Sequence, residues 1–164
     1  QLLFMGQEFA QRSEWHEDQS LEWWVDSLWG HDGMRHLVRR LNELQAEHPA
    51  LYQLDCSPEG FRWMNADDAG HNAYSFVRAD RDGELIACIT NFSPDPYPHY
   101  PISVPKAGTW QEILNTDSPE FNGGGMFDIS EPIVATEISS DEDSWAWATI
   151  SLPPMSAIWL RYQG

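Results

Sequence analysis

The chain has 164 residues and a formal net charge of −17 at pH 7, because 26 Asp and Glu residues stand against nine Lys and Arg residues. Nucleic acids and anionic membranes bind clustered Lys and Arg, so this balance argues against both as partners, whereas a neutral polysaccharide is compatible with it. The 41% hydrophobic content suffices for the core of one domain plus part of another, and no apolar run approaches the roughly 18 to 20 residues that span a bilayer.

The chain begins with a short apolar run, residues 2–5, which ends at Gly6 and is followed by acidic, amide and indole side chains. This pattern is typical of a buried parallel strand whose carboxyl end opens into a ligand-facing loop. The following residues offer one helix and no second parallel strand, so the backbone groups of this strand would need partners from earlier chain. We therefore interpret the sequence as the tail of a larger enzyme.

Apolar residues then recur at intervals of three and four, which predicts one amphipathic helix over residues 32–47, stopped by Pro49. The apolar stripe of this helix consists of Met34, Leu37, Val38, Leu41 and Leu44. Such a stripe requires a covering surface elsewhere in the protein.

From Gly60 onward the apolar residues follow a period of two, which predicts strands. Residues 80–83 are typical of a hairpin turn. Residues 85–89 are apolar on both faces, so they should form a central strand covered on one side by an opposing sheet and on the other by a layer that the helix can supply. The predicted strands are residues 61–64, 73–78, 84–92, 99–105, 109–115, 145–152 and 155–162. Short strands punctuated by Pro and Gly indicate an antiparallel β-sandwich.

Residues 116–144 form the least regular segment, with Gly123 to Gly125 and eight acidic residues. The segment is either a long loop or contains one short strand near residues 133–138. Directly after it, large and small side chains alternate over residues 145–148. This alternation predicts that the indoles of Trp145 and Trp147 share one face of a strand while the other face packs closely.

Several motifs, in chain order, resemble a single family. They are Phe4-Met5-Gly6-x-Glu8-Phe9-Ala10-Gln11, Glu14-Trp15, Asp18, Ser20-Leu21, Trp23, Leu37-Val38-Arg39, Leu41-Asn42, Pro49-Ala50-Leu51, Leu54-Asp55, Pro58-x-Gly60-Phe61, Asn91-Phe92-Ser93-Pro94, Trp110-x-Glu112-x-Leu114-Asn115-Thr116-Asp117 and Leu152-Pro153-Pro154. Together they resemble the carboxyl-terminal part of the bacterial-type glycogen branching enzymes, 1,4-α-glucan branching enzymes of the α-amylase superfamily. His16 and Glu17 depart from the usual Asn-His of that family, and Glu22 replaces its usual Asp.

The resemblance implies a mainly β fold, in which a C-terminal antiparallel β-sandwich follows the last β-strand and α-helix of a (β/α)8 barrel. Residues 1–53 would be the end of the catalytic barrel, and residues 54–164 would be an all-β domain. The apolar stripe of the helix would then cover a barrel strand.

The resemblance also implies a parent glycosyltransferase that cleaves α-1,4 linkages and transfers glucan chains to form α-1,6 branches. In such barrels the catalytic carboxylates follow the fourth, fifth and seventh strands, so we expect none in this chain and expect it to be inactive alone. The implied partners are an α-glucan, such as glycogen or amylose-like chains, and the catalytic barrel. Neither a metal nor an organic cofactor is implied, and the location would be cytoplasmic.

Glu8, Gln11, Glu14 and Trp15 occupy the carboxyl end of the predicted barrel strand and its loop, on the face of a barrel that carries active sites. Acidic and amide groups can hydrogen-bond to sugar hydroxyls while Trp15 stacks on a pyranose ring. The alternative is that these residues only support the loop.

Other features favour structural interpretations. We expect most of the nine Trp and seven Phe residues to fill the sandwich core rather than to stack on sugars. Residues 141–143, three consecutive acids, lack the spacing of a calcium loop and should be solvated. Cys56 and Cys88 have no metal-like spacing, which predicts buried free thiols.

Two other functions stay open. A free-standing carbohydrate-binding module would use exposed Trp side chains of the sandwich, and the chain alone would then bind glycogen or amylose. Another α-amylase superfamily enzyme, such as a trehalose-releasing hydrolase, would share the fold. The stretch from Glu14 to Trp23 favours a branching enzyme over that hydrolase.

Overall fold

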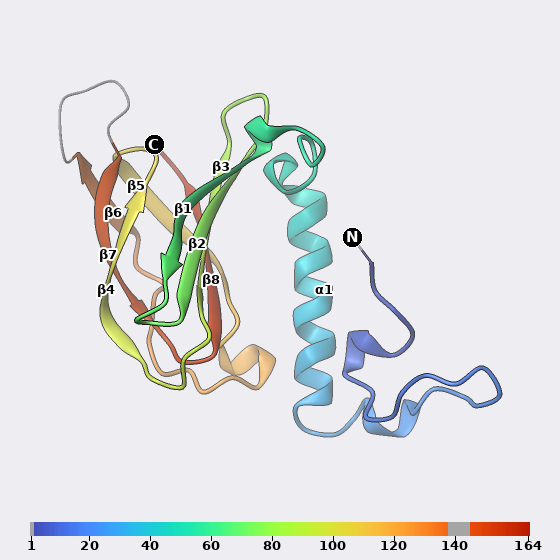
Figure 1. The fold of residues 1–164 in the computed structure, drawn as a ribbon. Coiled ribbons are helices and arrows are strands. Elements are labelled where there is room, and N and C mark those ends of the chain that lie inside the picture. The colour runs from blue at the N-terminus through green and yellow to red at the C-terminus, as the bar shows by residue number, and fades with distance from the viewer. Residues whose placement is uncertain (1, 138–144) are drawn as a thin grey trace.

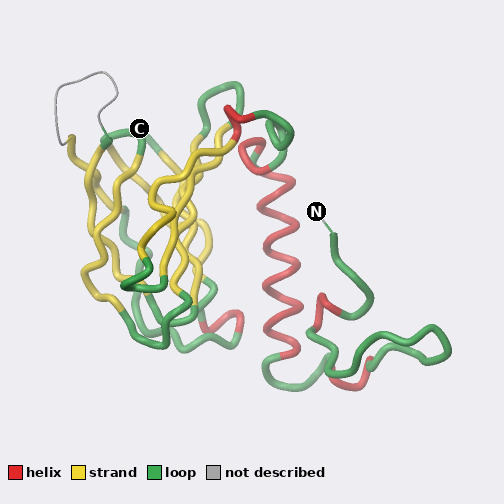
Figure 2. The backbone as a smooth tube through the Cα atoms, viewed as in Figure 1, coloured by secondary structure: helices red, strands yellow, loops and turns green. Residues whose placement is uncertain are grey.

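One α-helix stands between an irregular amino-terminal segment and an all-β domain in the computed structural model, which describes residues 2–137 and 145–164 (Figure 1). The helix, α1 (His31–Glu47), follows two short 3-10 turns, Gln7–Phe9 and Trp23–Val25. Figure 2 shows that the strands lie on one side of α1 and the amino-terminal loops on the other. The helix is thus the only regular element between the two parts of the described chain.

Eight antiparallel strands form the all-β domain. They are β1 (Phe61–Asp68), β2 (Ala73–Ala79), β3 (Leu85–Asn91), β4 (Tyr97–Val104), β5 (Gly108–Asn115), β6 (Ile133–Glu137), β7 (Ala146–Leu152) and β8 (Ser156–Tyr162). Their order is β1-β2-β3-β8-β5-β6-β7-β4, so the sheet folds over on itself and β6 passes from one layer to the other. The predicted antiparallel sandwich is confirmed, and the short strand predicted near residue 133 is β6.

The inner core lies between the two layers and follows the period of two read from the sequence. Alternate residues of β7, from Ala146 to Leu152, point inward and are buried, while Trp147 between them is exposed. The predicted alternation of faces is therefore confirmed for this strand. Trp110 fills the core as its largest fully buried side chain, and its indole N–H donates to the carbonyl of Lys106 at 3.1 Å.

β3 is the predicted central strand, covered on both faces. It pairs with β2 on one side and β8 on the other. Ala87 and Ile89 belong to the inner core, whereas Ile86 packs on the opposite face in a second cluster with Leu44 of α1 and Leu51. The helix therefore supplies the second covering layer, as the sequence indicated.

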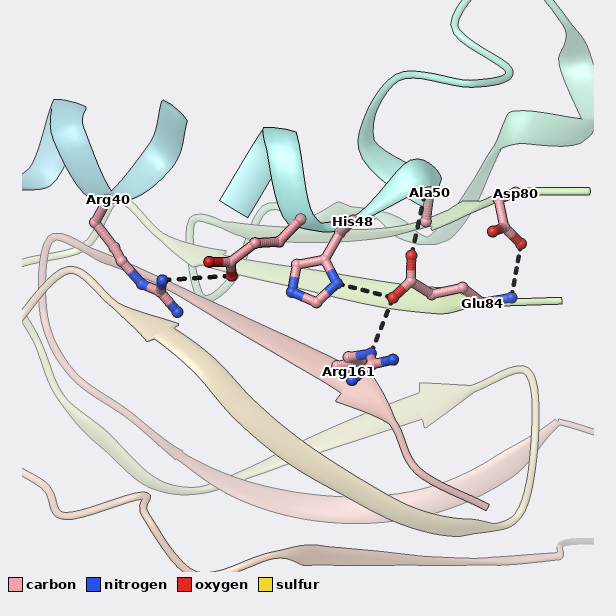
Figure 3. Close-up of polar contacts among 7 residues, drawn as sticks. Arg40, His48, Ala50, Asp80, Glu84 and Arg161 are labelled. Atoms are coloured by element: carbon pink, nitrogen blue, oxygen red, sulfur yellow. Dashed lines mark hydrogen bonds and ion pairs between the residues drawn. The ribbon is translucent and has the colours of Figure 1, made fainter. Parts of the chain in front are cut away.

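A half-buried carboxylate fastens the end of α1 to the sandwich (Figure 3). One oxygen of Glu84 accepts from Nδ1 of His48 at 2.8 Å and from Nε of Arg161 at 2.9 Å, and its other oxygen accepts from the N–H of Ala50 at 3.2 Å. These donors come from the end of the helix, from β8 and from the turn Pro49–Leu51. Glu84 thus joins three elements at one point.

The start of α1 docks on the loop after β5. The side-chain amide of Asn122 donates to Asp32 at 2.7 Å, and Gly33 lies so close to the loop that an added Cβ would overlap the carbonyl of Phe121. The helix is therefore fastened to the sandwich at both ends.

Residues 2–5, which the sequence predicted as a strand, form no strand here and are exposed, Leu2 by 87%. A single extended segment gains no ladder of backbone hydrogen bonds without a neighbouring strand, which explains why none forms. The assignment of this segment to a barrel stays a prediction.

Two further expectations are wrong. Of the nine Trp residues, only Trp110 is buried, and six are exposed: Trp15, Trp23, Trp24, Trp29, Trp63 and Trp147. Cys56 is also exposed, whereas Cys88 is buried as predicted. Compositional counting cannot tell on which face of a strand or loop a ring lies. The acidic residues 141–143 lie outside the described residues.

Candidate functional site

The amino-terminal loop is folded back on itself by two residues with positive φ. Gly6 (φ 83°) and Ala10 (φ 53°) flank the turn Gln7–Phe9, and the Gly6 carbonyl accepts from the N–H of Gln11 at 2.9 Å. Positive φ is favourable for glycine and strained for alanine, so the surrounding contacts must hold Ala10 in place. The turn therefore directs the chain after Gln11 back toward α1.

His31, the first residue of α1, holds this turn. Its Nδ1 lies 2.9 Å from the Phe9 carbonyl, and its Nε2 accepts from Nε of Arg12 at 3.3 Å. A carbonyl only accepts and a guanidinium only donates, so these contacts assign the ring proton to Nδ1. Phe9 itself is fully buried and packs on Trp23 with ring centroids 5.3 Å apart.

Glu22 holds the segment that follows. Its carboxylate accepts from the N–H of Arg12 at 2.9 Å, from the N–H of Ser13 at 3.1 Å and from the Ser13 hydroxyl at 2.7 Å. The hydroxyl bond of Ser13, followed by its backbone bond, holds the pKa of Glu22 below its ordinary value. The N–H of Glu22 in turn donates to the side-chain oxygen of Gln11 at 3.0 Å.

An open cavity of about 590 Å³ lies in this loop, and three of the four predicted site residues line it. Gln11, Glu14 and Trp15 share it with backbone and side chains of residues 4–7, Ala10, Ser13 and Met34. Trp15 is 37% exposed and meets Phe4 edge to face at 5.5 Å between ring centroids. Glu8 does not line the cavity and belongs to the turn Gln7–Phe9.

The three lining residues differ in their freedom to bind a ligand. The amide of Gln11 already bonds to Glu22 and to the Ser13 carbonyl, which gives it a supporting role in the loop. The carboxylate of Glu14 has no hydrogen-bond partner within the described residues. Glu14 and Trp15 both line the cavity. An acceptor beside an aromatic ring suits a polyhydroxylated ring that has one apolar face. Glu14 is the single carboxylate among the described lining residues, whereas retaining glycosyl transfer needs two.

A second surface was missed by the sequence analysis: a row of five aromatic side chains on the outer face of β1 and β2 and at the end of β3, which we call the aromatic row. Neighbouring ring centroids along it lie 5.0 to 6.3 Å apart. Trp63 at its centre is 50% exposed. The members are Phe61, Trp63, Tyr74, Phe76 and Phe92.

The sequence did hold a signal for the aromatic row. Phe61 and Trp63 are two residues apart, as are Tyr74 and Phe76, and a spacing of two places each pair on one face of a strand. The buried residues of β2, among them Ser75 and Val77, are the small or aliphatic side chains between them. Bulky rings alternating with smaller residues therefore marked the outer face, not the core.

A polar cluster lies beside one end of the aromatic row. Asp68 accepts from the Tyr100 hydroxyl at 2.6 Å and contacts Nδ1 of His71 at 2.7 Å, and the Tyr97 hydroxyl donates to the His71 carbonyl at 3.1 Å. Partial burial by itself would raise the pKa of Asp68, but the bonds from Tyr100 and His71 outweigh it and hold that pKa below its ordinary value. Burial and the neighbouring Asp68 raise the pKa of Tyr100.

In residues 2–137 and 145–164, no group of three or more His, Cys, Asp or Glu side chains is placed to hold a metal ion. The one helix found there, α1, is neither long nor apolar enough to cross a membrane.

The all-β fold defines the class of protein to which the sandwich belongs. A family model described as "Alpha amylase, C-terminal all-beta domain" matches residues 63–163, and the chain is a member of that family. Two relatives share one name. The chain is 52% identical to the 1,4-alpha-glucan branching enzyme GlgB of Cutibacterium acnes, over 99% of this chain and 25% of that protein. It is 41% identical to the enzyme of the same name from Mycolicibacterium paratuberculosis, over 98% of this chain and 22% of that protein.

The chain thus spans about a quarter of the length of these relatives. Among solved structures, a Group B Streptococcus pullulanase, SAP, matches 85% of this chain and 18% of its own, with a TM-score of 0.48 and 13% identity. A likeness of that degree carries no argument about function.

Proposed function

We propose that this chain is the carboxyl-terminal part of a 1,4-α-glucan branching enzyme, whose intact form makes α-1,6 branches in glycogen. One observation carries the proposal: the 52% identity to a branching enzyme extends over 99% of the chain. It therefore includes most of residues 1–62, which lie outside the match to the all-β family. Relatives that share only an accessory sandwich would be similar over that domain alone.

In the proposed reaction, an α-1,4 linkage of a glucan is cleaved and the chain is held as a covalent glycosyl intermediate. A 6-hydroxyl of a second glucan then attacks the intermediate, and its proton passes to the base, so that an α-1,6 bond replaces the bond that was broken. The nucleophile and the acid/base lie in the part of the enzyme outside this chain, and the 164-residue chain alone is inactive. Neither a metal nor an organic cofactor takes part, and the reaction takes place in the cytoplasm.

Residues 1–53 belong to the catalytic barrel in this proposal, and residues 54–164 form the domain that supports it. Support comes from the apolar surface around the start of the chain. Leu2 and Leu3 line an open hollow of about 410 Å³ together with Val38 and Leu41 of α1. Apolar surface of this kind is stabilised when another part of the protein covers it, and the preceding barrel is the proposed cover.

Glu14 and Trp15 are the proposed glucan contacts in the loop cavity. Gln11 orients the loop through its bonds to Glu22 and Ser13, and Glu8 belongs to the turn behind it. In the intact enzyme we expect Trp15→Ala to raise KM for amylose about tenfold, which corresponds to a loss of roughly 1.4 kcal/mol of binding. Steady-state kinetics of branch formation measure KM, and a thermal unfolding curve shows whether the variant is folded.

The matched control is Trp147→Ala, which removes an indole exposed to a similar degree on β7, far along the chain from the loop. It should leave KM unchanged. Equal kinetics for the Trp15 variant and the control would contradict the assignment of the loop cavity. Branched product made by the 164-residue chain alone would contradict the proposal that the catalytic carboxylates lie outside this chain.

The aromatic row favours a second candidate function, that of a carbohydrate-binding module in which the sandwich itself holds glucan. Exposed aromatic rings on a sheet face can stack on pyranose rings, and Trp63 is the most exposed of the five. In this case the 164-residue chain binds maltoheptaose, and Trp63→Ala weakens that binding about tenfold while Trp147→Ala does not. Isothermal titration of the chain tests this, and the absence of heat with maltoheptaose at millimolar concentration would reject it.

A further inference from the structure

Three donors of the loop converge on the Glu22 carboxylate, and all three belong to Arg12 and Ser13, the two residues directly before the proposed glucan contacts. No polar contact within the described chain fixes the Glu14 side chain, and Trp15 packs perpendicular to the Phe4 ring. The direction in which Glu14 and Trp15 point therefore follows from the conformation of the backbone at Arg12 and Ser13.

We propose that Glu22 is a positioning residue for glucan binding, which holds residues 12–13 so that Glu14 and Trp15 face the loop cavity. This inference rests on the proposed function and adds to it a residue that touches no substrate. Glu22 does not line the cavity and acts through the backbone that it binds.

The chemistry of the contact favours a carboxylate. Both oxygens are engaged, Oε2 by two backbone N–H groups and Oε1 by the Ser13 hydroxyl. Hydrogen bonds to an ionised acceptor are roughly twice as strong as neutral ones. A glutamine has one oxygen and one NH2 group, so the Ser13 hydroxyl would have to accept instead of donate, and the contact would lose its charge. Glu22→Asp would keep the charge with a side chain shorter by one methylene.

Hydrogen bonds of Gln11 link the same two residues, Glu22 and Ser13, a second time. The N–H of Glu22 donates to Oε1 of Gln11, and Nε2 of Gln11 donates to the Ser13 carbonyl at 3.1 Å. Gln11, Ser13 and Glu22 thus form a closed ring of hydrogen bonds around the loop. Loss of the Glu22 carboxylate removes the only charged member of that ring.

The test uses the intact enzyme and compares Glu22→Gln, Glu22→Asp, Ser13→Ala and the double variant Ser13→Ala with Glu22→Gln. Glu17→Gln is the matched control, because it removes one negative charge from an exposed position of the same loop. We expect Glu22→Gln to raise KM for amylose about tenfold with kcat within about twofold of the parent, and Glu22→Asp to restore most of the loss. The double variant should be no worse than Glu22→Gln, because both changes break the same contact.

If the role of Glu22 were purely structural, Glu22→Gln would lower the unfolding temperature but would have the same KM as the Glu17→Gln control. A KM for Glu22→Gln within twofold of the Glu17→Gln control overturns the inference, and so does an additive effect in the double variant.

Amide hydrogen exchange on the 164-residue chain, without any glucan, separates this inference from the proposed function. We expect exchange at residues 12–15 to be at least tenfold faster in Glu22→Gln than in the control. If the intact parent forms no branches, the proposed function fails, but the exchange result still shows whether Glu22 fixes residues 12–15. If the parent is active but exchange is unchanged in Glu22→Gln, the inference fails and the function stands.

Discussion

The carboxylate of Asp68 is held by several polar side chains between β1 and β4. Asp68, near the open end of the sheet, accepts from a tyrosine hydroxyl and contacts a histidine ring, while Tyr97 reaches the carbonyl of the same histidine. β1 and β4 are the two ends of the sheet order, and no backbone ladder joins them among the described residues. The side chains of Asp68, His71, Tyr97 and Tyr100 close this seam in place of backbone hydrogen bonds.

Stability should therefore depend on the ionisation of Asp68. Folding lowers its pKa, so the ionised form is favoured in the folded state. The stabilisation is complete above the ordinary pKa of 3.8 and is lost as pH falls through the lower folded value. We expect Asp68→Asn to be less stable than the parent at pH 7, and the difference to shrink below about pH 4. Urea unfolding at both pH values measures it.

Asp67→Asn is the control for that experiment, because Asp67 is exposed and adjacent on β1. It should show no such difference at either pH. A stability gap between the Asp68 variant and the parent that persists unchanged at pH 3 would show that its origin is not the charge.

At the scale of elements, α1 is defined as much by what it docks on as by its own sequence. The spacing of its apolar residues predicted residues 32–47, within one residue of the observed bounds. The sequence did not reveal that Gly33 lies against the carbonyl of Phe121, since that contact joins segments almost ninety positions apart. From sequence alone, a glycine early in a helix only lowers the helix propensity; the close contact that requires it is seen only in the structure.

Gly33→Ala tests this contact. In an exposed helix the change would stabilise by up to about 1 kcal/mol, because alanine has the higher helix propensity. Here the added methyl overlaps the Phe121 carbonyl, so we expect a loss of roughly 2 kcal/mol in the free energy of unfolding. Gly70→Ala is the matched control, because its added Cβ would be 3.9 Å from the nearest atom, a carboxylate oxygen of Asp68. Chemical denaturation of both variants gives the comparison; equal stability would mean that the loop gives way freely.

Strands were more predictable than surfaces. The period of two located seven of the strands because burial of alternate residues is imposed by the pleat itself. The same period also indicated the aromatic row. It was missed because we expected large rings to fill the core. Gln11, Glu14 and Trp15 lie around one cavity, and their role in binding stays a prediction. The bonds of Glu22 and His31 depend on a fold-back that no local pattern encodes.

At the scale of the whole molecule, the described chain has one face that its own residues do not cover. Leu2 and Leu3 are exposed beside half-buried Val38 and Leu41 of α1, although α1 is well packed against the sandwich on its other side. Under the proposed division at residue 53, this face is an internal boundary of a larger enzyme.

Leu3→Ser distinguishes a boundary from a true surface. In the 164-residue chain Leu3 is 54% exposed, so the change should alter the free energy of unfolding by less than about 0.5 kcal/mol. In the intact protein the same leucine is expected to be buried, and the change should cost about 2 kcal/mol or more. Denaturation of both proteins supplies the comparison. A small effect in both would argue against a barrel over this face.

The attachment of α1 at both ends has a mechanical consequence. With Glu84 tying one end and the Gly33 contact the other, the helix cannot roll or slide without dragging the β-domain along. Whatever larger body incorporates the helix must therefore move together with that domain as one solid piece. Any change of shape has to arise in the segments outside this piece, among them residues 2–30 ahead of the helix.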